Sequence, residues 1–289
     1  MLRPGARFYS RLPEEKRPRR NHAVPPWLSG ERRSLSVPPP PNSARSAPHL
    51  PTWKDGSVDK AALVTGGSSG IGFAIGSMLR ENGFALTLAA RTPKKVEAAA
   101  ETLGAHAVTA DVADAEDCRR LVEEHRAQHG RLDVLVNCAG VGIAGPVDEL
   151  ETKHIDLQLN VNLRGTILVT AAALPMLRET HGLIVNLASI AGTSPSSHLP
   201  VYGAAKAAVI NFTIALNRGE EKHGVRATAL SPGFVDTPMT SWAPVPPEQM
   251  IRPEDCAEVV RALLHLSPHA RLPHVVIERV STEESVFGA

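Results

Sequence analysis

Short apolar runs alternate with longer amphipathic stretches along the chain from Ala61 onward. Each short run predicts a buried strand; the runs are Ala61–Thr65, Ala85–Ala90, Ala105–Ala110, Val134–Asn137, Leu183–Leu187, Arg226–Ser231 and Val275–Val280. Each longer stretch carries apolar residues at helical spacing and predicts a helix; the stretches are Ile71–Glu81, Pro93–Leu103, Ala115–Gln128, Thr152–Arg178, Val201–Lys222 and Pro253–Leu266. Alternating strands and helices favour the α/β class: one doubly wound domain of about seven parallel strands with helices on both faces.

Residues 1–55 differ from the rest of the chain in composition. They hold eleven of the twenty-four prolines and show no hydrophobic period. A segment with so few apolar residues cannot bury a core, so we predict a disordered Pro/Arg-rich N-terminal extension over 1–55. The folded domain is expected over 56–280, and a flexible C-terminal tail over 281–289. The pairs Arg19-Arg20 and Arg32-Arg33 are not followed by the apolar segment of an export signal.

The charges are also unevenly distributed. Residues 1–55 contain eleven Lys or Arg against four Asp or Glu, whereas the remainder contains twenty against twenty-six. The basic segment lacks the interleaved aromatic residues of a nucleic-acid-binding arm, so we expect no nucleic-acid partner. No apolar run approaches the ~18 residues of a membrane helix, so we expect no membrane association.

The cysteines and histidines give no sign of a metal site. Cys118, Cys138 and Cys256 form no Cys-x-x-Cys motif and no even-numbered disulfide framework, and a reducing cytoplasm is the expected location. His125 and His129 have the i, i+4 spacing of a zinc pair, but no Glu lies between them in the His-Glu-x-x-His manner. We therefore interpret them as a solvated helix face and expect no metal.

The first predicted strand runs into a glycine-rich turn, Thr65-Gly66-Gly67-Ser68-Ser69-Gly70-Ile71-Gly72. Glycines allow the backbone to turn tightly and to approach a pyrophosphate, whose charge the N-terminus of the following helix attracts. A turn of this kind, placed after a first strand and before a helix, predicts a dinucleotide-binding loop.

Tyr202 and Lys206 lie four residues apart in the helix Val201–Lys222, which places them one turn apart on the same face. A neighbouring ammonium favours the phenolate and lowers the pKa of a phenol from about 10, so Tyr202 is a candidate proton donor or acceptor. Ser189 follows the strand Leu183–Leu187, at the strand end where α/β sheets present their reacting groups. Alone, the Tyr–Lys pair is typical of an ordinary amphipathic face; the other motifs favour a catalytic role.

Together these motifs resemble those of the short-chain dehydrogenase/reductase family. The resemblance covers essentially all of residues 57–280, and its segments occur in the family's order and spacing: Thr65–Gly72, Asn137-Cys138-Ala139-Gly140, Asn162, Ser189, Tyr202-x-x-x-Lys206 and Pro232-Gly233-Phe234-Val235-Asp236-Thr237. It implies a Rossmann-like NAD(P)-binding domain. It also implies hydride transfer between a nicotinamide cofactor and a small-molecule carbonyl compound or secondary alcohol.

The resemblance further implies roles for individual residues. Tyr202 would be the general acid in reduction or the base in oxidation, Lys206 would lower its pKa and hold the ribose, and Ser189 would bind the substrate oxygen. Asn162 would hold a water that links Lys206 to solvent; Asn160 is the rival position, and the leucine after Asn162 fits the family's pattern. The expected cofactor contacts are Gly66, Ser68, Ser69, Gly70, Ile71, Gly72, Arg91, Asp111, Val112, Asn137, Ala139, Gly140, Tyr202, Lys206, Pro232, Gly233, Val235 and Thr237.

The second predicted strand, Ala85–Ala90, ends without an acidic residue, and Arg91 follows it directly. An Asp or Glu at that place would bond the ribose 2′-hydroxyl of NAD and repel a phosphate. An arginine instead makes charge-assisted hydrogen bonds to a 2′-phosphate, and Lys94 and Lys95 add positive charge. The glycine loop lacks the basic residue that some NADP-dependent relatives place there. We expect NADP(H) to be favoured over NAD(H).

A catalytically silent NADP-binding regulatory or interaction protein is the alternative, because a fold alone does not prove activity. The complete Ser–Tyr–Lys set favours an enzyme. By the same resemblance we expect a homodimer or homotetramer that pairs through Thr152–Arg178 and Val201–Lys222. The substrate pocket is expected to be lined by Val141–Pro146, Ile190–Leu199 and Pro238–Ile251.

Overall fold

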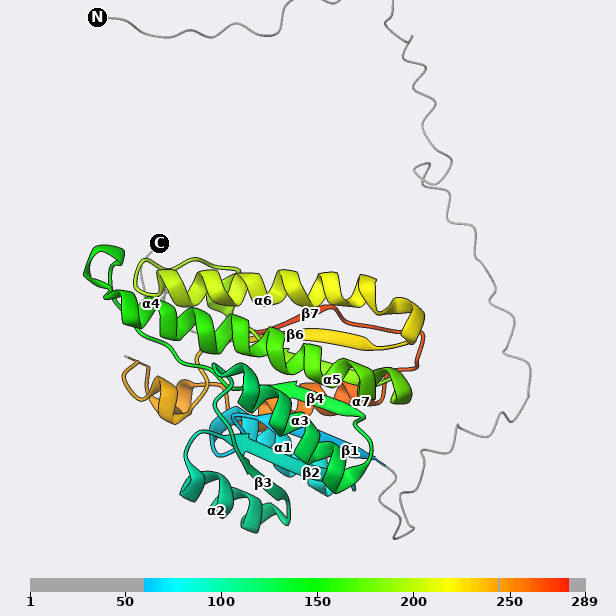
Figure 1. Cartoon of the computed structure of the whole chain (residues 1–289). Coiled ribbons are helices and arrows are strands. Elements are labelled where there is room, and N and C mark those ends of the chain that lie inside the picture. The colour runs from blue at the N-terminus through cyan, green and yellow to red at the C-terminus, as the bar shows by residue number, and fades with distance from the viewer. Residues whose placement is uncertain (1–59, 244, 281–289) are drawn as a thin grey trace, which may run out of the picture. The chain divides into compact units, whose positions relative to one another are not determined.

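The computed structural model describes residues 60–243 and 245–280. The extension predicted over 1–55 and the tail predicted over 281–289 lie outside the described residues. Within the described part, one parallel sheet has the strand order β3-β2-β1-β4-β5-β6-β7 (Figure 1). The strands are β1 Ala61–Thr65, β2 Ala85–Ala90, β3 His106–Thr109, β4 Val134–Asn137, β5 Leu183–Leu187, β6 Arg226–Pro232 and β7 His274–Ile277. The α/β class and the parallel sheet predicted from the sequence are confirmed.

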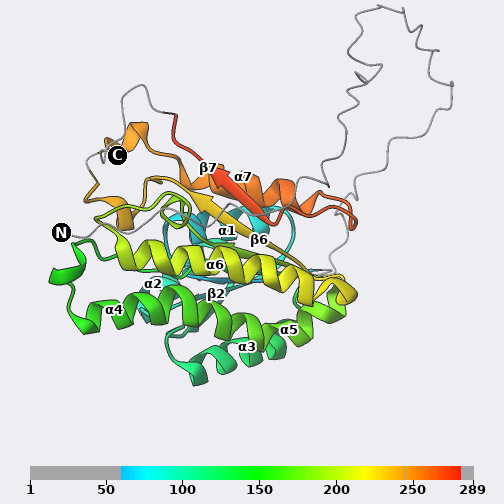
Figure 2. The same ribbon diagram turned by 90° about the horizontal axis from the view of Figure 1, so that it is seen from above.

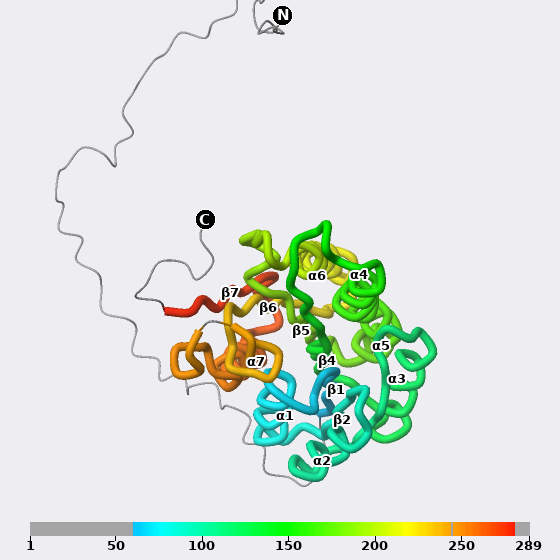
Figure 3. The backbone as a smooth tube through the Cα atoms, turned by 90° about the vertical axis from the view of Figure 1, so that its left-hand side faces the viewer, coloured from blue at the N-terminus to red at the C-terminus, as the bar shows by residue number. Residues whose placement is uncertain are grey.

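Helices cover both faces of the sheet, as Figures 2 and 3 show. One face carries α1 (Gly70–Glu81), α2 (Pro93–Leu103) and α7 (Pro253–Leu264). The other carries α3 (Ala115–His129), α4 (Thr152–Leu159), α5 (Thr166–Thr180) and α6 (Pro200–Gly219). The domain is therefore doubly wound, as predicted.

Each strand contributes side chains to both layers, since successive strand residues point to opposite faces. Val64 of β1 belongs to the apolar cluster shared with α1 and α7, whereas its neighbour Leu63 belongs to the cluster shared with α3 and α5. Both side chains are fully buried. This double burial explains why the strands read as continuous apolar runs in the sequence.

The prediction of one continuous helix over Thr152–Arg178 is wrong in one respect. A π-helical turn, Asn160–Gly165, separates α4 from α5. The Thr166 hydroxyl donates to the main-chain oxygen of Asn162 at 2.9 Å, which gives that carbonyl a side-chain partner within the irregular turn. Such turns are frequent at functional sites.

The strand order reverses at β1, whose neighbours are β2 and β4. Thr65 at the end of β1 pairs with Asn137 at the end of β4, and Asn137 pairs with Asn186 near the end of β5. Ligands of doubly wound sheets bind outside the carboxyl ends of the strands at such a reversal. The fold therefore places the candidate site at these three strand ends. Among the described residues, no helix has the length and apolarity to cross a membrane.

Candidate active site

The glycine-rich turn after β1 adopts a conformation that other residues would disturb. Gly66 has φ +67° and Gly70 has φ +53°, both in the left-handed region that favours glycine. A Cβ atom at Gly72 would lie 2.3 Å from the main-chain oxygen of Gly66. The turn is therefore packed closely against the start of α1, which leaves its outer surface free to approach a ligand.

This turn forms one wall of a cavity of about 290 Å³ at the strand ends. Eleven residues predicted to contact a cofactor line it: Gly66, Ser68, Ser69, Gly70, Ile71, Gly72, Arg91, Val112, Ala139, Gly140 and Thr237. Thr92 and Lys95, at the start of α2, lie in the wall beside Arg91. The cavity thus combines a close-packed glycine turn with a basic end, which fits the pyrophosphate of a dinucleotide.

A second cavity, of about 90 Å³, lies at the ends of β5 and β6. It brings together Ser189, Tyr202 and Lys206, together with Pro232, Gly233, Val235 and Thr237. Ile71, Cys138, Gly140, Thr237 and Met239 line both cavities. The two cavities therefore adjoin along a shared wall, and we call them together the cleft.

Lys206 is buried and bonded to the sheet. Its side chain is 4% exposed, and Nζ donates a 2.6 Å hydrogen bond to the main-chain oxygen of Leu187 at the end of β5. Burial lowers the pKa of Lys206 to about 8. Nζ lies 5.5 Å from the centre of the Tyr202 ring. The predicted proximity of these two residues on α6 is confirmed.

The predicted effect of the lysine on the tyrosine is not found in this structure. Burial raises the pKa of Tyr202 above the ordinary value of a phenol, and the hydrogen bond with the Ser189 side chain opposes this rise. Desolvation therefore outweighs this hydrogen bond. The Lys206 ammonium is itself buried and bonded to Leu187. Ser189 Oγ also accepts a 3.2 Å bond from the main-chain NH of Ala191, which orients it at the end of β5.

Asn162 lies in the π-helical turn with its side chain 0% exposed. Its Nδ2 donates to the main-chain oxygen of Val141 at 2.7 Å, and its Oδ1 accepts from the main-chain NH of Val141 at 3.1 Å. This two-way bond holds the segment after Gly140 against the helix. Asn160, the rival position, is half-buried. The role of Asn162 in holding a water stays a prediction.

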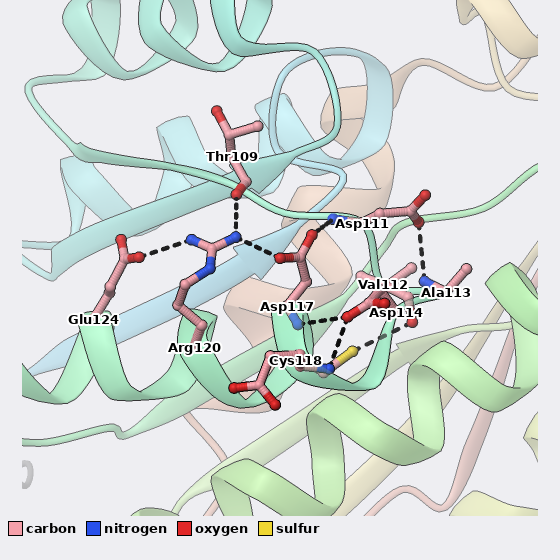
Figure 4. A network of polar contacts seen from close by, with 10 residues as sticks. Thr109, Asp111, Val112, Ala113, Asp114, Asp117, Cys118, Arg120 and Glu124 are labelled. Carbon is pink, nitrogen blue, oxygen red and sulfur yellow. Dashed lines mark hydrogen bonds and ion pairs between the residues drawn. The ribbon is translucent and has the colours of Figure 1, made fainter.

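Neither cavity is lined by Asp111, Asn137 or Asn162, all of which the sequence placed at the site. Asp111 lies in the turn between β3 and α3, where its carboxylate accepts from the main-chain NH of Ala113 at 2.9 Å (Figure 4). The main-chain NH of Asp111 donates to Asp117 at 2.8 Å, and Arg120 bonds Asp117 in turn. This network fixes the turn that carries Val112 into the cleft.

The three segments expected to line the substrate pocket make two notable main-chain contacts. The main-chain NH of Gly145 donates to the main-chain oxygen of His198 at 2.9 Å, so the segments Val141–Pro146 and Ile190–Leu199 lie side by side. The segment after β6 is closed by a bridge between Val235 and Ile251. Of the three segments, only the last lines the two cavities, through Pro238, Met239 and Thr240.

Some lining residues belong to segments that the sequence analysis placed at the site, but had no predicted role of their own. Cys138, Met239 and Thr240 line the cleft beside the candidate catalytic residues. Thr240 Oγ1 donates to the main-chain oxygen of Val235 and accepts from the main-chain NH of Thr237. Cys138 follows β4 whereas Met239 and Thr240 follow β6, so the fold brings side chains from two parts of the chain to one cavity.

The interpretation of His125 and His129 as a solvated helix face is wrong. His125 is 0% exposed, and its ring contacts Thr87 Oγ1 at 2.8 Å and the main-chain oxygen of Arg131 at 3.0 Å. His129 Nε2 lies 3.1 Å from the same hydroxyl. Helix α3 packs this side on β2, so the pair faces the sheet. In the described part of the chain, no group of three or more His, Cys, Asp or Glu gathers where it could hold a metal ion.

Comparisons with known proteins agree with this geometry. A family model described as short chain dehydrogenase matches residues 60–244. An uncharacterized oxidoreductase of Staphylococcus aureus is 34% identical over 227 residues, which are 77% of this chain and 98% of that protein. A similar protein of Staphylococcus epidermidis is 34% identical over 228 residues, with the same shares of the two chains.

Two solved structures share the fold. An alcohol dehydrogenase from the archaeon Thermococcus sibiricus, complexed with 5-hydroxy-NADP, has a TM-score of 0.73 and 29% identity, covering 78% of this chain and 99% of that one. A 3-ketoacyl-(acyl-carrier-protein) reductase from Brucella melitensis, complexed with NADH, has a TM-score of 0.70 and 27% identity, covering 76% and 97%.

Proposed function

The chain belongs to the short chain dehydrogenase family and is an oxidoreductase of that family, and from this premise we propose a specific reaction. The protein transfers a hydride between NADP(H) and a carbonyl compound or secondary alcohol. The observation that supports this proposal best is the meeting of Ser189, Tyr202 and Lys206 in a cavity that adjoins the one lined by the glycine turn. A silent cofactor-binding protein has no need of this complete set.

Different residues of the cleft bind different parts of the cofactor. The glycine turn and the start of α1 hold the pyrophosphate. Arg91 and Lys95 hold the phosphate of the adenosine ribose, and Lys206 holds the nicotinamide ribose. When bound, the nicotinamide supplies or accepts the hydride.

The protein's own residues handle the proton and the charge. Tyr202 Oη gives its proton to the carbonyl oxygen during reduction and takes it back during oxidation. Ser189 Oγ donates a hydrogen bond to that oxygen as negative charge develops on it. Lys206, charged below its pKa of about 8, places an ammonium beside the phenolate that Tyr202 becomes after donation. This favours proton transfer in the reacting state, even though burial keeps the phenol neutral beforehand.

The preference for NADP(H) rests on the end of β2. Ala90 closes the strand without a carboxylate, and Arg91, Thr92 and Lys95 line the adjacent cavity wall. Two cations and a hydroxyl suit a ribose phosphate, whereas no carboxylate lines this wall to bond a ribose 2′-hydroxyl.

The segment around the substrate end of the cleft is mainly apolar. Met239 is 42% exposed and Trp242 is 50% exposed, and Trp242 meets Phe234 edge-on with the ring centres 6.5 Å apart. We therefore propose a small carbonyl or alcohol substrate with an apolar body. We also propose a cytoplasmic homodimer or homotetramer, pairing through α4, α5 and α6, where Leu159 and Ile167 are exposed.

A panel of ketones and aldehydes, followed by the absorbance of NADPH, tests the reaction class. Tyr202→Phe removes only the phenol hydroxyl, and the chain has one other tyrosine, Tyr9, outside the domain. We expect this variant to lose at least ~100-fold in kcat with cofactor affinity nearly unchanged. Retention of most of the activity in Tyr202→Phe would refute the mechanism.

A further inference from the structure

Four buried polar side chains form a chain of hydrogen bonds inside the sheet–helix layer below the cleft. Asn137 Nδ2 donates to Thr170 Oγ1 at 2.9 Å and to Asn186 Oδ1 at 2.8 Å. Asn186 Nδ2 donates to Thr213 Oγ1 at 2.9 Å. None of the four residues is more than 3% exposed. We call Asn137, Thr170, Asn186 and Thr213 the core polar network.

The network joins the elements that deliver the candidate catalytic residues. Asn186 lies on β5, immediately before Leu187 and three residues before Ser189. Thr213 lies on α6, two helical turns after Lys206. The bond between Asn186 and Thr213 therefore connects the same strand and helix as the bond between Leu187 and Lys206. Two polar links fix α6 to β5 on the same buried face.

The other members reach the remaining parts of the site. Thr170 lies on α5, which continues the π-helical turn that holds Asn162. Asn137 ends β4 and precedes the segment that lines the cleft with Ala139 and Gly140. Elements that are distant in the sequence thus share one connected set of hydrogen bonds.

A polar contact specifies register in a way that apolar packing does not. Apolar burial is non-directional, so a helix can slide or rotate slightly with little change in buried area. A hydrogen bond needs a donor and an acceptor at about 3 Å with good alignment. If α6 shifted along β5, Asn186 would lose its partner while still buried, which costs far more than the bond itself contributes.

The hydrogen bond between Asn186 and Thr213 can run in one direction only. The Thr213 hydroxyl donates to the main-chain oxygen of Val209 at 2.7 Å, so toward Asn186 it can only accept. At the other end, Asn137 Oδ1 is buried with no hydrogen-bond partner. An unpaired buried acceptor destabilises the fold. A core shaped for stability alone would favour apolar residues here, so the network points to a second role.

We propose that Asn186 and Thr213 are positioning residues, which set the register of α6 against β5 and so hold Tyr202 against Ser189. The inference rests on the proposed function only for its expected effect on kcat. Its structural consequence, a change around the Tyr202 phenol, is measurable whether or not the protein turns over a substrate.

Thr213→Val tests the inference, because it keeps the side-chain shape and removes the hydroxyl that accepts from Asn186. Thr213→Ser restores the hydroxyl. Val209→Ala is the matched control: Val209 is 0% exposed and lies between Lys206 and Thr213 on the same helix, but its side chain makes no polar contact. All variants are made in the full chain and compared by their Tm.

The first measurement is carbon-13 NMR of labelled tyrosine as a function of pH. The chain has two tyrosines, so Tyr202→Phe assigns the Tyr202 signal. We expect Thr213→Val to shift the resonance and the titration midpoint of Tyr202, Thr213→Ser to return both to the wild-type values, and Val209→Ala to leave both unchanged despite a lower Tm. An unchanged Tyr202 signal in Thr213→Val, or an equal shift in Val209→Ala, would overturn the inference.

The second measurement is steady-state kinetics with cofactor binding. We expect Thr213→Val to lose at least ~10-fold in kcat, because small displacements of reacting groups cost large factors in rate. Cofactor Kd should stay within ~2-fold and Thr213→Ser should recover the rate. If the wild type shows no turnover, the proposed function fails, and the NMR result still decides this inference. If Thr213→Val does not fold, Thr213→Ala removes the same hydroxyl with a smaller side chain and replaces it in both measurements.

Discussion

Lys206 Nζ and the main-chain oxygen of Leu187 lie 2.6 Å apart and form a buried hydrogen bond that ties α6 to the end of β5. The bond gives one of the three N–H donors of this ammonium a partner, and Lys206 is 4% exposed. Because Leu187 stands two residues before Ser189, the same bond fixes the helix that carries Tyr202 relative to the strand that carries the serine. The lysine therefore has a structural role as well as the chemical one proposed.

Lys206→Met should affect both cofactor binding and catalysis, whereas Tyr202→Phe should affect catalysis alone. Methionine keeps the length and apolar stem of lysine but cannot donate to Leu187 or to a cofactor ribose. We expect kcat to fall by at least ~100-fold and cofactor Kd to rise, since both a proton-transfer aid and a ribose contact are lost. Isothermal titration with NADPH measures the second effect. Lys222→Met, at an exposed lysine beyond the end of α6, is the control; equal losses in both variants would contradict the assignment.

Arg91→Ala tests the cofactor preference. We expect the wild type to favour NADP(H) by at least ~10-fold, about 1.4 kcal/mol, and the variant to lose that preference by weaker binding of NADP(H) alone. Lys95→Ala should act in the same direction, because Lys95 also lines the cavity. Lys94→Ala, an exposed neighbour outside the cavity wall, should leave the ratio of kcat/KM for the two cofactors unchanged. Equal use of both cofactors by the wild type would show that Arg91 does not bind the phosphate.

Gly72→Ala tests the close packing of the glycine turn. The added Cβ would meet the main-chain oxygen of Gly66 at 2.3 Å, so the turn must move. We expect cofactor affinity to fall by at least ~10-fold with a lower Tm, because overpacking costs about 1–3 kcal/mol. Gly219→Ala is the control, since a Cβ there meets nothing within 4 Å. Cofactor binding that survives intact in Gly72→Ala would show that the turn tolerates the shift.

His125 should make the domain sensitive to acid. Burial lowers the pKa of His125 from 6.5 to about 4. Below pH 6.5 the unfolded chain binds a proton that the folded chain refuses, so stability falls as the pH drops from 6.5 toward 4 and is unaffected above that window. A fall of the pKa from 6.5 to about 4 corresponds to a loss of about 3 kcal/mol.

Denaturant unfolding of the wild type and His125→Gln between pH 7 and pH 4 measures this contribution. We expect His125→Gln to be less stable at pH 7, where the bonds to Thr87 and Arg131 are disturbed, but to lose less stability on acidification. His269→Gln, at an exposed histidine between α7 and β7, should follow the wild type. Parallel pH curves for the wild type and His125→Gln would show that this histidine is not the acid-sensitive group.

The sequence by itself determined the fold and most of the cleft. Apolar runs such as Val134–Asn137 predicted strands because both faces of a parallel sheet are buried, which leaves a continuous local signal. The glycine turn and the Tyr202–Lys206 spacing are likewise local patterns. The structure places Gly66–Gly72 and Arg91 around one cavity, and Ser189, Tyr202 and Lys206 around the adjoining one.

Only the tertiary structure decided the environment of these groups. His125 is buried because α3 turns that side toward Thr87 of β2, and the i, i+4 spacing of two histidines is the same on a solvated face. The pKa of Tyr202 rises because desolvation outweighs the hydrogen bond with Ser189, and the spacing of residues along a helix does not report burial. The link between Asn186 and Thr213 joins residues 27 positions apart. Such contacts depend on which elements pack together, so they are set by the assembled fold and leave no period in the chain.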